Sequence, residues 1–148
     1  MKKAFTLVEI IIVISVMMIL TGLASLSLVS SSRASSLDEA KLISLGAIRE
    51  GQNNSLVGVD GLAWGVHLEE NRLIIFADSG SGFQEEDVRN QPRLLPSGAV
   101  LSWSITGGGA EIFFSPRTGQ TPNFGTLTLN FGDSSADISL SPEGVIDY

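Results

Sequence analysis

Few side chains in this chain are of the types that carry out catalysis. His67 is the single histidine and there is no cysteine, so neither a histidine-based metal cluster nor a Ser-His-Asp triad can be assembled. GDSSA at 132–136 has the small residues of a nucleophile elbow, but no strand-to-helix pattern surrounds it, and we interpret it as a turn. GGG at 107–109 is also interpreted as a turn, because no helix pattern follows it. The sequence therefore predicts a protein that is not an enzyme and has no cofactor.

Acidic residues cluster at Glu85, Glu86 and Asp87, with Asp78 nearby. Their spacing does not match that of an EF-hand calcium loop, so we predict a solvated loop over 78–92 and no metal site. His67 occupies an alternating position in a strand pattern, which predicts a surface or edge residue. The aromatic residues in the strand patterns are predicted to pack in the core or on a sheet face: Trp64, Trp103, Phe113 and Phe114.

The charge of the C-terminal part argues against nucleic acid as a partner. Residues 54–148 contain four arginines, no lysine and twelve acidic residues, a net charge of −8. Such a field repels a polyanion, so direct binding of DNA is not expected.

Glu9 is the one charged residue between Phe5 and Val29, a run of 25 residues. Twenty residues from Ile10 would form a helix about 30 Å long, the thickness of a bilayer core. A carboxylate at the centre of a membrane helix costs about 2.5–3.5 kcal/mol on insertion scales, so its presence requires an explanation. Lys2 and Lys3 precede the run, which predicts a single-pass protein with a cytoplasmic N-terminus and an exported body.

Three interpretations of this N-terminus differ in what they make of Glu9. A secretory signal peptide would be cut near GLA at 22–24 or SRA at 32–34, and a plain anchor would stay uncut; neither gives Glu9 a role. In the third, a cut between Ala4 and Phe5 creates an amino group one helical turn from Glu9. The carboxylate can then pair with that amine or with the amine of a neighbouring chain. We favour the third interpretation because it alone uses Glu9.

The segment A-FTLVE followed by a long apolar run resembles the cleavage and methylation segment of type IV prepilins and type II secretion pseudopilins. The resemblance covers about the first 30 residues. It implies that prepilin peptidase cuts between Ala4 and Phe5 and N-methylates Phe5, and that Glu9 is the assembly residue. Two features depart from the family: Ala4 stands where a glycine is usual, and the helix-bending proline is missing.

The family resemblance also implies partners and a location. The partners are other pilin or pseudopilin subunits and the assembly platform of the inner membrane. The precursor would sit in the inner (cytoplasmic) membrane with its head domain outside the cytoplasm, and the assembled subunit in a periplasmic or cell-surface filament.

The remaining sequence predicts a second helical part and then a β-rich domain. Ser36 and Glu39 fit a capping box, and Gly51, Asn53 and Asn54 supply a stop. Between them apolar residues recur at spacings of three and four: Leu37, Ala40, Ile43, Ala47 and Ile48. The serine-rich stretch 30–36 leaves open whether one long helix or two helices form. We predict a leader at 1–4, a transmembrane and filament-core helix at 5–29, an amphipathic continuation at 30–53 and a head domain at 54–148.

The head domain shows short β patterns separated by turn residues, with a hairpin connection at 68–72. This predicts an α+β fold in which the long N-terminal helix packs on an antiparallel sheet domain. The strings WGVHLEENRLIIFAD, LPSGAVLS, IFFSPRTGQTPNFGTLTL and ISLSPEGVIDY resemble the head of GspH/FimT minor pseudopilins. That resemblance implies a non-catalytic minor subunit near a filament tip. The alternatives are a major or adhesive pilin and a plain membrane-anchored extracytoplasmic β-domain binding protein.

Overall fold

The computed structural model describes residues 6–148; for residues 23–31 it describes the backbone alone. One long helix, α1 (Leu7–Val57), is followed by eight strands in this part of the chain. Residue contacts divide the chain into two units, Met1–Ala34 and Ser35–Tyr148. The serine-rich residues 30–36 are helical and belong to α1.

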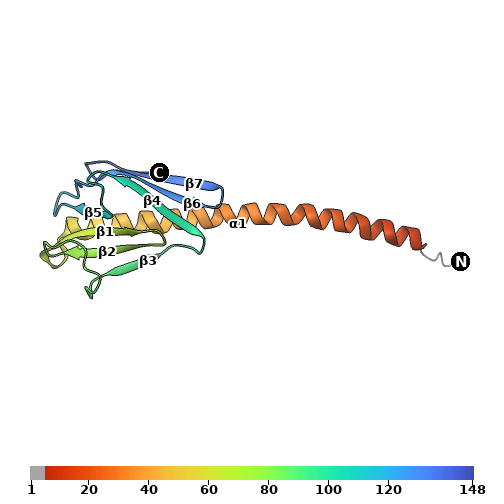
Figure 1. The fold of residues 1–148 in the computed structure, drawn as a ribbon, viewed down its shortest axis with the longest axis horizontal. Helices are drawn as coiled ribbons and strands as arrows, with labels where there is room; N and C mark the ends of the chain where they lie inside the picture. The colour runs from red at the N-terminus through yellow and green to blue at the C-terminus, as the bar shows by residue number, and fades with distance from the viewer. Residues whose placement is uncertain (1–5) are drawn as a thin grey trace. The chain divides into compact units, whose positions relative to one another are not determined.

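The second unit contains two four-stranded sheets, joined to α1 by a short 3-10 turn (Val59–Gly61), and every pair of neighbouring strands is antiparallel. The first sheet has the order β3 (Gln91–Leu94), β2 (Arg72–Asp78), β1 (Ala63–Glu69), β5 (Glu111–Phe114). The second has the order β4 (Ala99–Ile105), β6 (Gly125–Phe131), β7 (Ser134–Leu140), β8 (Ile146–Asp147). Their strands gather around the C-terminal half of α1 (Figure 1). The predicted α+β fold, a helix on antiparallel sheets, is confirmed.

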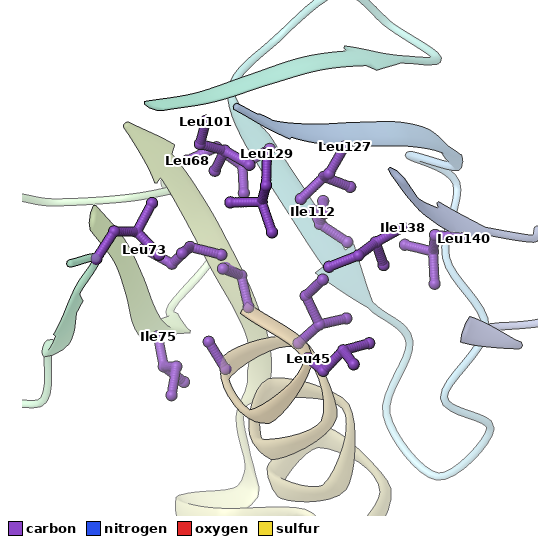
Figure 2. Packing of buried hydrophobic residues seen from close by; sticks show 14 of the residues in the cluster. Leu45, Leu68, Leu73, Ile75, Leu101, Ile112, Leu127, Leu129, Ile138 and Leu140 are labelled. Carbon is purple, nitrogen blue, oxygen red and sulfur yellow. The ribbon is translucent and has the colours of Figure 1, made fainter. Parts of the chain in front are cut away.

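One hydrophobic core lies between this half of α1 and the two sheets. The predicted apolar face of the helix is confirmed: Ala40, Ala47 and Ile48 are buried, and Leu37 and Ile43 pack against them. Alternate strand residues complete the core because successive side chains of a strand point to opposite faces. Figure 2 shows Leu45 of α1 facing side chains of both sheets, among them Leu68, Leu73, Ile75, Ile112, Leu101, Leu127, Leu129, Ile138 and Leu140.

Two strands were not predicted from the sequence. β3 contains Pro92, which cannot donate to a ladder, but β3 pairs with β2 alone and an edge strand tolerates proline. β8 has two residues, too few for a recognisable alternation. The predicted loop at 78–92 is therefore shorter: β2 ends at Asp78 and β3 begins at Gln91.

The predicted stop of the helix at Gly51–Asn54 is wrong, because α1 continues to Val57. Gly51 is buried against β1, where a Cβ would lie 3.1 Å from Val66 Cγ2, so its small size serves packing and does not end the helix. Gly58 ends it instead. Its φ of 73° is left-handed, and its N–H donates to the carbonyl of Asn54 (3.0 Å), which forms a glycine C-cap.

Candidate functional site

The N-terminal part of α1 is an apolar helix whose side chains contact little else in the chain. Every residue from Thr6 to Gly22 is exposed, including Leu7 (77 %) and Met18 (70 %). An apolar surface of this extent requires a covering by lipid or by other protein chains. Among the residues described with their side chains, no helix meets the combined length and hydropathy of a membrane span.

The hydroxyl groups in this segment are satisfied within the helix. Ser15 donates to the carbonyl of Ile11 (2.8 Å), and Thr21 donates to the carbonyl of Met17 (2.7 Å). A hydroxyl bonded one turn back in this way needs no partner outside its own helix. Within Thr6–Gly22 the carboxylate of Glu9 is thus the charged group that has no hydrogen-bond or ion-pair partner among the described residues.

Glu9 lies in the first turn of α1. The Thr6 hydroxyl accepts the N–H of Glu9 (3.3 Å), so the two residues have the spacing of a capping box. Its carboxylate is exposed, and no described residue forms an ion pair or hydrogen bond with it. The positive end of the helix dipole favours a negative charge at this position. The predicted processing residues Ala4 and Phe5 lie outside the described residues, so the cleavage and methylation sites stay predictions, as does the assembly role of Glu9.

Polar residues near the end of α1 fasten the helix to the sheets, and the sequence analysis missed them. Ser55, buried, donates to the carbonyl of Phe114 on β5 (2.6 Å) and accepts the N–H of Trp64 on β1 (3.5 Å). The amide of Gln52 donates to the carbonyls of Gly119 (3.0 Å) and Gly144 (2.8 Å). Their spacing from Ile48, four and seven residues, continues the buried face of the helix. That spacing was the available signal.

His67 lies in the interior of the first sheet. It is on β1, between β2 and β5, so of the predicted alternatives, a surface or an edge residue, the edge position is wrong, and its ring is half-buried. The ring stacks on Phe83 with centroids 4.0 Å apart, and Nδ1 is 3.7 Å from a carboxylate oxygen of Glu111. Phe83 also meets the edge of Phe76. These contacts hold the β2–β3 loop against the outer face of the first sheet.

The tryptophan-glycine pair at the start of β1 has a packing explanation. Trp64 points into the core and is 3 % exposed. Gly65 faces the other side, where a Cβ would lie 2.6 Å from the carbonyl oxygen of Ile112 and 2.9 Å from Phe76 Cζ. Phe76 is therefore buried on the outer face only because residue 65 has no side chain.

The acidic loop uses its carboxylates internally. Asp78 accepts the N–H groups of Gly80 (2.7 Å) and Gly82 (3.0 Å). The Arg89 guanidinium and backbone N–H bond to Asp87 and lower the pKa of that carboxyl to about 2. Glu85 and Glu86 are exposed. No group of three or more histidine, cysteine, aspartate or glutamate side chains within the described residues is arranged to hold a metal ion.

The remaining sequence motifs are structural. The GGG segment lies in a turn between β4 and β5, as predicted. In the GDSSA segment only Gly132 and Asp133 form the turn between β6 and β7, because β7 already begins at Ser134. Trp103 is half-buried, and its indole N–H donates to the carbonyl of Gly109 (3.0 Å).

Three of the four arginines after residue 54 are paired with carboxylates. Arg72 pairs with Glu69, Arg89 with Asp87 and Arg93 with Glu50. The Glu69 bond keeps the Arg72 pKa above its ordinary value, and that of Glu69 is correspondingly lowered. These three guanidinium groups are therefore not free for contacts with phosphates.

Comparison with known proteins gives one match to the N-terminal sequence and one to the fold. Residues 1–25 match the family model of the prokaryotic N-terminal methylation motif. No curated protein matches the chain. The structure is similar to the crystal structure of the type IV minor pilin FimU of Pseudomonas aeruginosa (strain PAO1), with a TM-score of 0.58 and 13 % sequence identity. The match covers 79 % of this chain and 90 % of that one.

At this identity the likeness to FimU shows the fold alone, and the methylation motif is matched at the N-terminus. The methylation motif includes the start of a helix of 51 residues, and this helix leads into antiparallel sheets, which is the pilin-like α+β arrangement. Pilins are structural subunits without catalytic activity. The chain is thus similar to type IV pilin-like proteins in its N-terminal motif and in its fold.

Proposed function

We propose that this chain is a minor pilin or pseudopilin, a structural subunit of a type IV pilus or type II secretion filament. Prepilin peptidase cuts it between Ala4 and Phe5 and methylates the new amine of Phe5. The subunit is held in the inner membrane by residues 5–29, with its head domain on the extracytoplasmic side. It then enters a periplasmic or cell-surface filament with other pilin-like subunits.

The observation that carries the proposal is a carboxylate without a partner among the described residues, at the start of an exposed apolar helix and within a methylation motif. Moving this helix from lipid into a bundle of similar helices changes its apolar surroundings little, so packing alone selects the register weakly. A buried charge that must find an amine fixes the register, as one polar residue does in a coiled coil. Glu9 is one helical turn from the amine that cleavage at Phe5 would create. A minor rather than a major subunit is supported by the similarity of the fold to a minor pilin.

The processing step is tested by the intact mass and N-terminal fragment spectrum of the protein from cells with and without prepilin peptidase. We expect a chain that begins at Phe5 and carries one extra methyl group on its amine, and only when the peptidase is present. A chain that begins at Met1, or after Ala24 or Ala34, with or without the peptidase would refute the proposal. Those termini would favour a plain anchored protein or a secreted β-domain protein.

The assembly role is tested by Glu9→Gln, which removes the charge and keeps the size. We expect the fraction of subunit in sheared filaments to fall at least about tenfold, because the amine loses its partner. Glu39→Gln is the matched control, since Glu39 is an exposed carboxylate on the same helix. The mass spectrum should show normal cleavage in both variants. Normal assembly of the Glu9 variant would show that this carboxylate has no part in assembly.

A further inference from the structure

A hollow of about 380 Å³ lies between the end of α1 and the start of β1. The turn after β5 forms the opposite wall. Its lining combines apolar groups, two glycines and a single charged residue: Val57, Gly58, Gly61, Leu62, Pro116 and Arg117. Val57 is 72 % exposed although it is apolar, and Arg117 is exposed as well.

Arg117 has an unusual backbone conformation. Its φ is 65°, in the left-handed region where an L side chain is unfavourable and glycine is not. The conformation lets the Arg117 N–H donate to the carbonyl of Ser55 (3.1 Å), one of the carbonyls left over at the end of α1. Glycine would make the same backbone bond without strain. The backbone bond therefore explains why residue 117 has this conformation, but it does not explain why the residue is an arginine.

The guanidinium of Arg117 is not used by the described part of the chain. Of the four arginines after residue 54, the other three are held by Glu69, Asp87 and Glu50. For Arg117 no ion pair or side-chain hydrogen bond with a described residue is formed. One local effect remains, the attraction of a cation to the negative end of α1, which is weak at an exposed site and screened by salt. Backbone strain that retains an unused side chain is typical of positions with a function.

We propose that this hollow binds an acidic segment of a neighbouring pilin-like subunit, and that Arg117 pairs with a carboxylate of that segment. The inference rests on the proposed function, because it requires a neighbouring subunit. Charge decides the class of ligand. A guanidinium binds a carboxylate through two parallel N–H···O bonds, and Val57 and Leu62 offer apolar contact beside it. A nucleic acid would need several cations, whereas one unpaired arginine stands in a domain with a net charge of −8.

The site is tested with the full chain in its own cells by placing a photo-crosslinking residue at position 57. Cross-linked peptides are then identified by mass spectrometry. We expect an Asp- or Glu-containing segment of another protein that carries a prepilin motif. Arg117→Gly and Arg117→Asn should lower the yield at least about tenfold, and Arg117→Lys should retain most of it. A cross-linker at Val88, which is 97 % exposed and outside the hollow, is the control whose yield should not depend on Arg117.

The melting temperature distinguishes the proposed contact with a neighbouring subunit from a role of Arg117 in stabilising its own chain. Arg117→Gly should raise the Tm of the detergent-solubilised full chain by about 2–5 °C, because glycine relieves the strain. A lower Tm would mean that the guanidinium stabilises its own chain, and the proposal would then fail. It would also fail if position 57 gave no cross-link to an acidic segment, gave one to nucleic acid or lipid alone, or gave the same yield in Arg117→Gly.

The N-terminal mass from the same cells shows which of the two proposals has failed. A chain that begins at Phe5 but gives cross-links independent of Arg117 contradicts the docking site alone. A chain that is not processed contradicts the proposed function.

Discussion

The two ends of α1 are built from similar apolar residues but meet different surroundings. From Thr6 to Gly22 every side chain is exposed, and isoleucine, valine and methionine occur on all sides of the helix. From Ala40 to Ser55 one face is buried against the sheets, and the other carries charged and polar residues. An amphipathic helix is covered by its own chain, whereas a helix that is apolar all round needs partners outside it. Stability and assembly should therefore depend on different halves of one helix.

The largest expected contrast compares two isoleucines of α1. Ile48 is fully buried and Ile12 is 57 % exposed. Ile48→Ala leaves a cavity in the core, so we expect the free energy of unfolding to fall by about 2–5 kcal/mol. Ile12→Ala should change it by no more than about 0.5 kcal/mol. Urea unfolding of the full chain in detergent, followed by the fluorescence of Trp64 and Trp103, measures both. Equal losses would mean that residues 6–22 unfold together with the head domain, against the comparison.

Two serines give a smaller contrast of the same kind. Ser55 bonds across to β5 and β1 from a buried position, whereas Ser15 bonds one turn back at an exposed one. Ser55→Ala leaves the carbonyl of Phe114 and the N–H of Trp64 without this partner, so we expect a loss of about 1–3 kcal/mol. Ser15→Ala should be close to neutral, because a hydroxyl bonded in this way adds little to a helix. The same unfolding measurement applies, and a neutral Ser55→Ala would show that water replaces the hydroxyl.

The sequence predicted what depends on near neighbours in the chain. Periodicity predicts the helix with its apolar face and six of the strands, and the structure contains them. Turn residues predict the turns at GGG and at the start of GDSSA, which are also present. The predicted end of α1 was too early. Glycine often ends a helix, but Gly51 is held within α1 by its packing on Val66. β3 was missed because whether a strand with Pro92 can form depends on its place at a sheet edge.

The candidate site divides in the same way. Glu9 stands out in the sequence because its neighbours are apolar and the motif around it is short. Gln52, Ser55 and Arg117 do not, since their partners lie far along the chain; the Gln52 amide bonds to residues 67 and 92 positions away. The spacing of Gln52 and Ser55 from Ile48 places them on the buried face of α1, but it does not identify their partners. The strain at Arg117 also becomes visible only with the backbone angles.

The smallest expected effect tests the second half of α1 by itself, with two glycines five residues apart. At Gly46 a Cβ would meet nothing within 4 Å, so Gly46→Ala gains helix propensity alone and should stabilise the chain by about 0.5–1 kcal/mol. At Gly51 a Cβ would lie 3.1 Å from Val66 Cγ2 and 3.3 Å from the carbonyl oxygen of Gly65. Crowding against β1 should cancel or reverse the gain in Gly51→Ala. Urea unfolding of the two variants measures the difference. An equal gain at both positions would mean that β1 moves aside easily, and that the contact of α1 with the sheet is looser than its burial indicates.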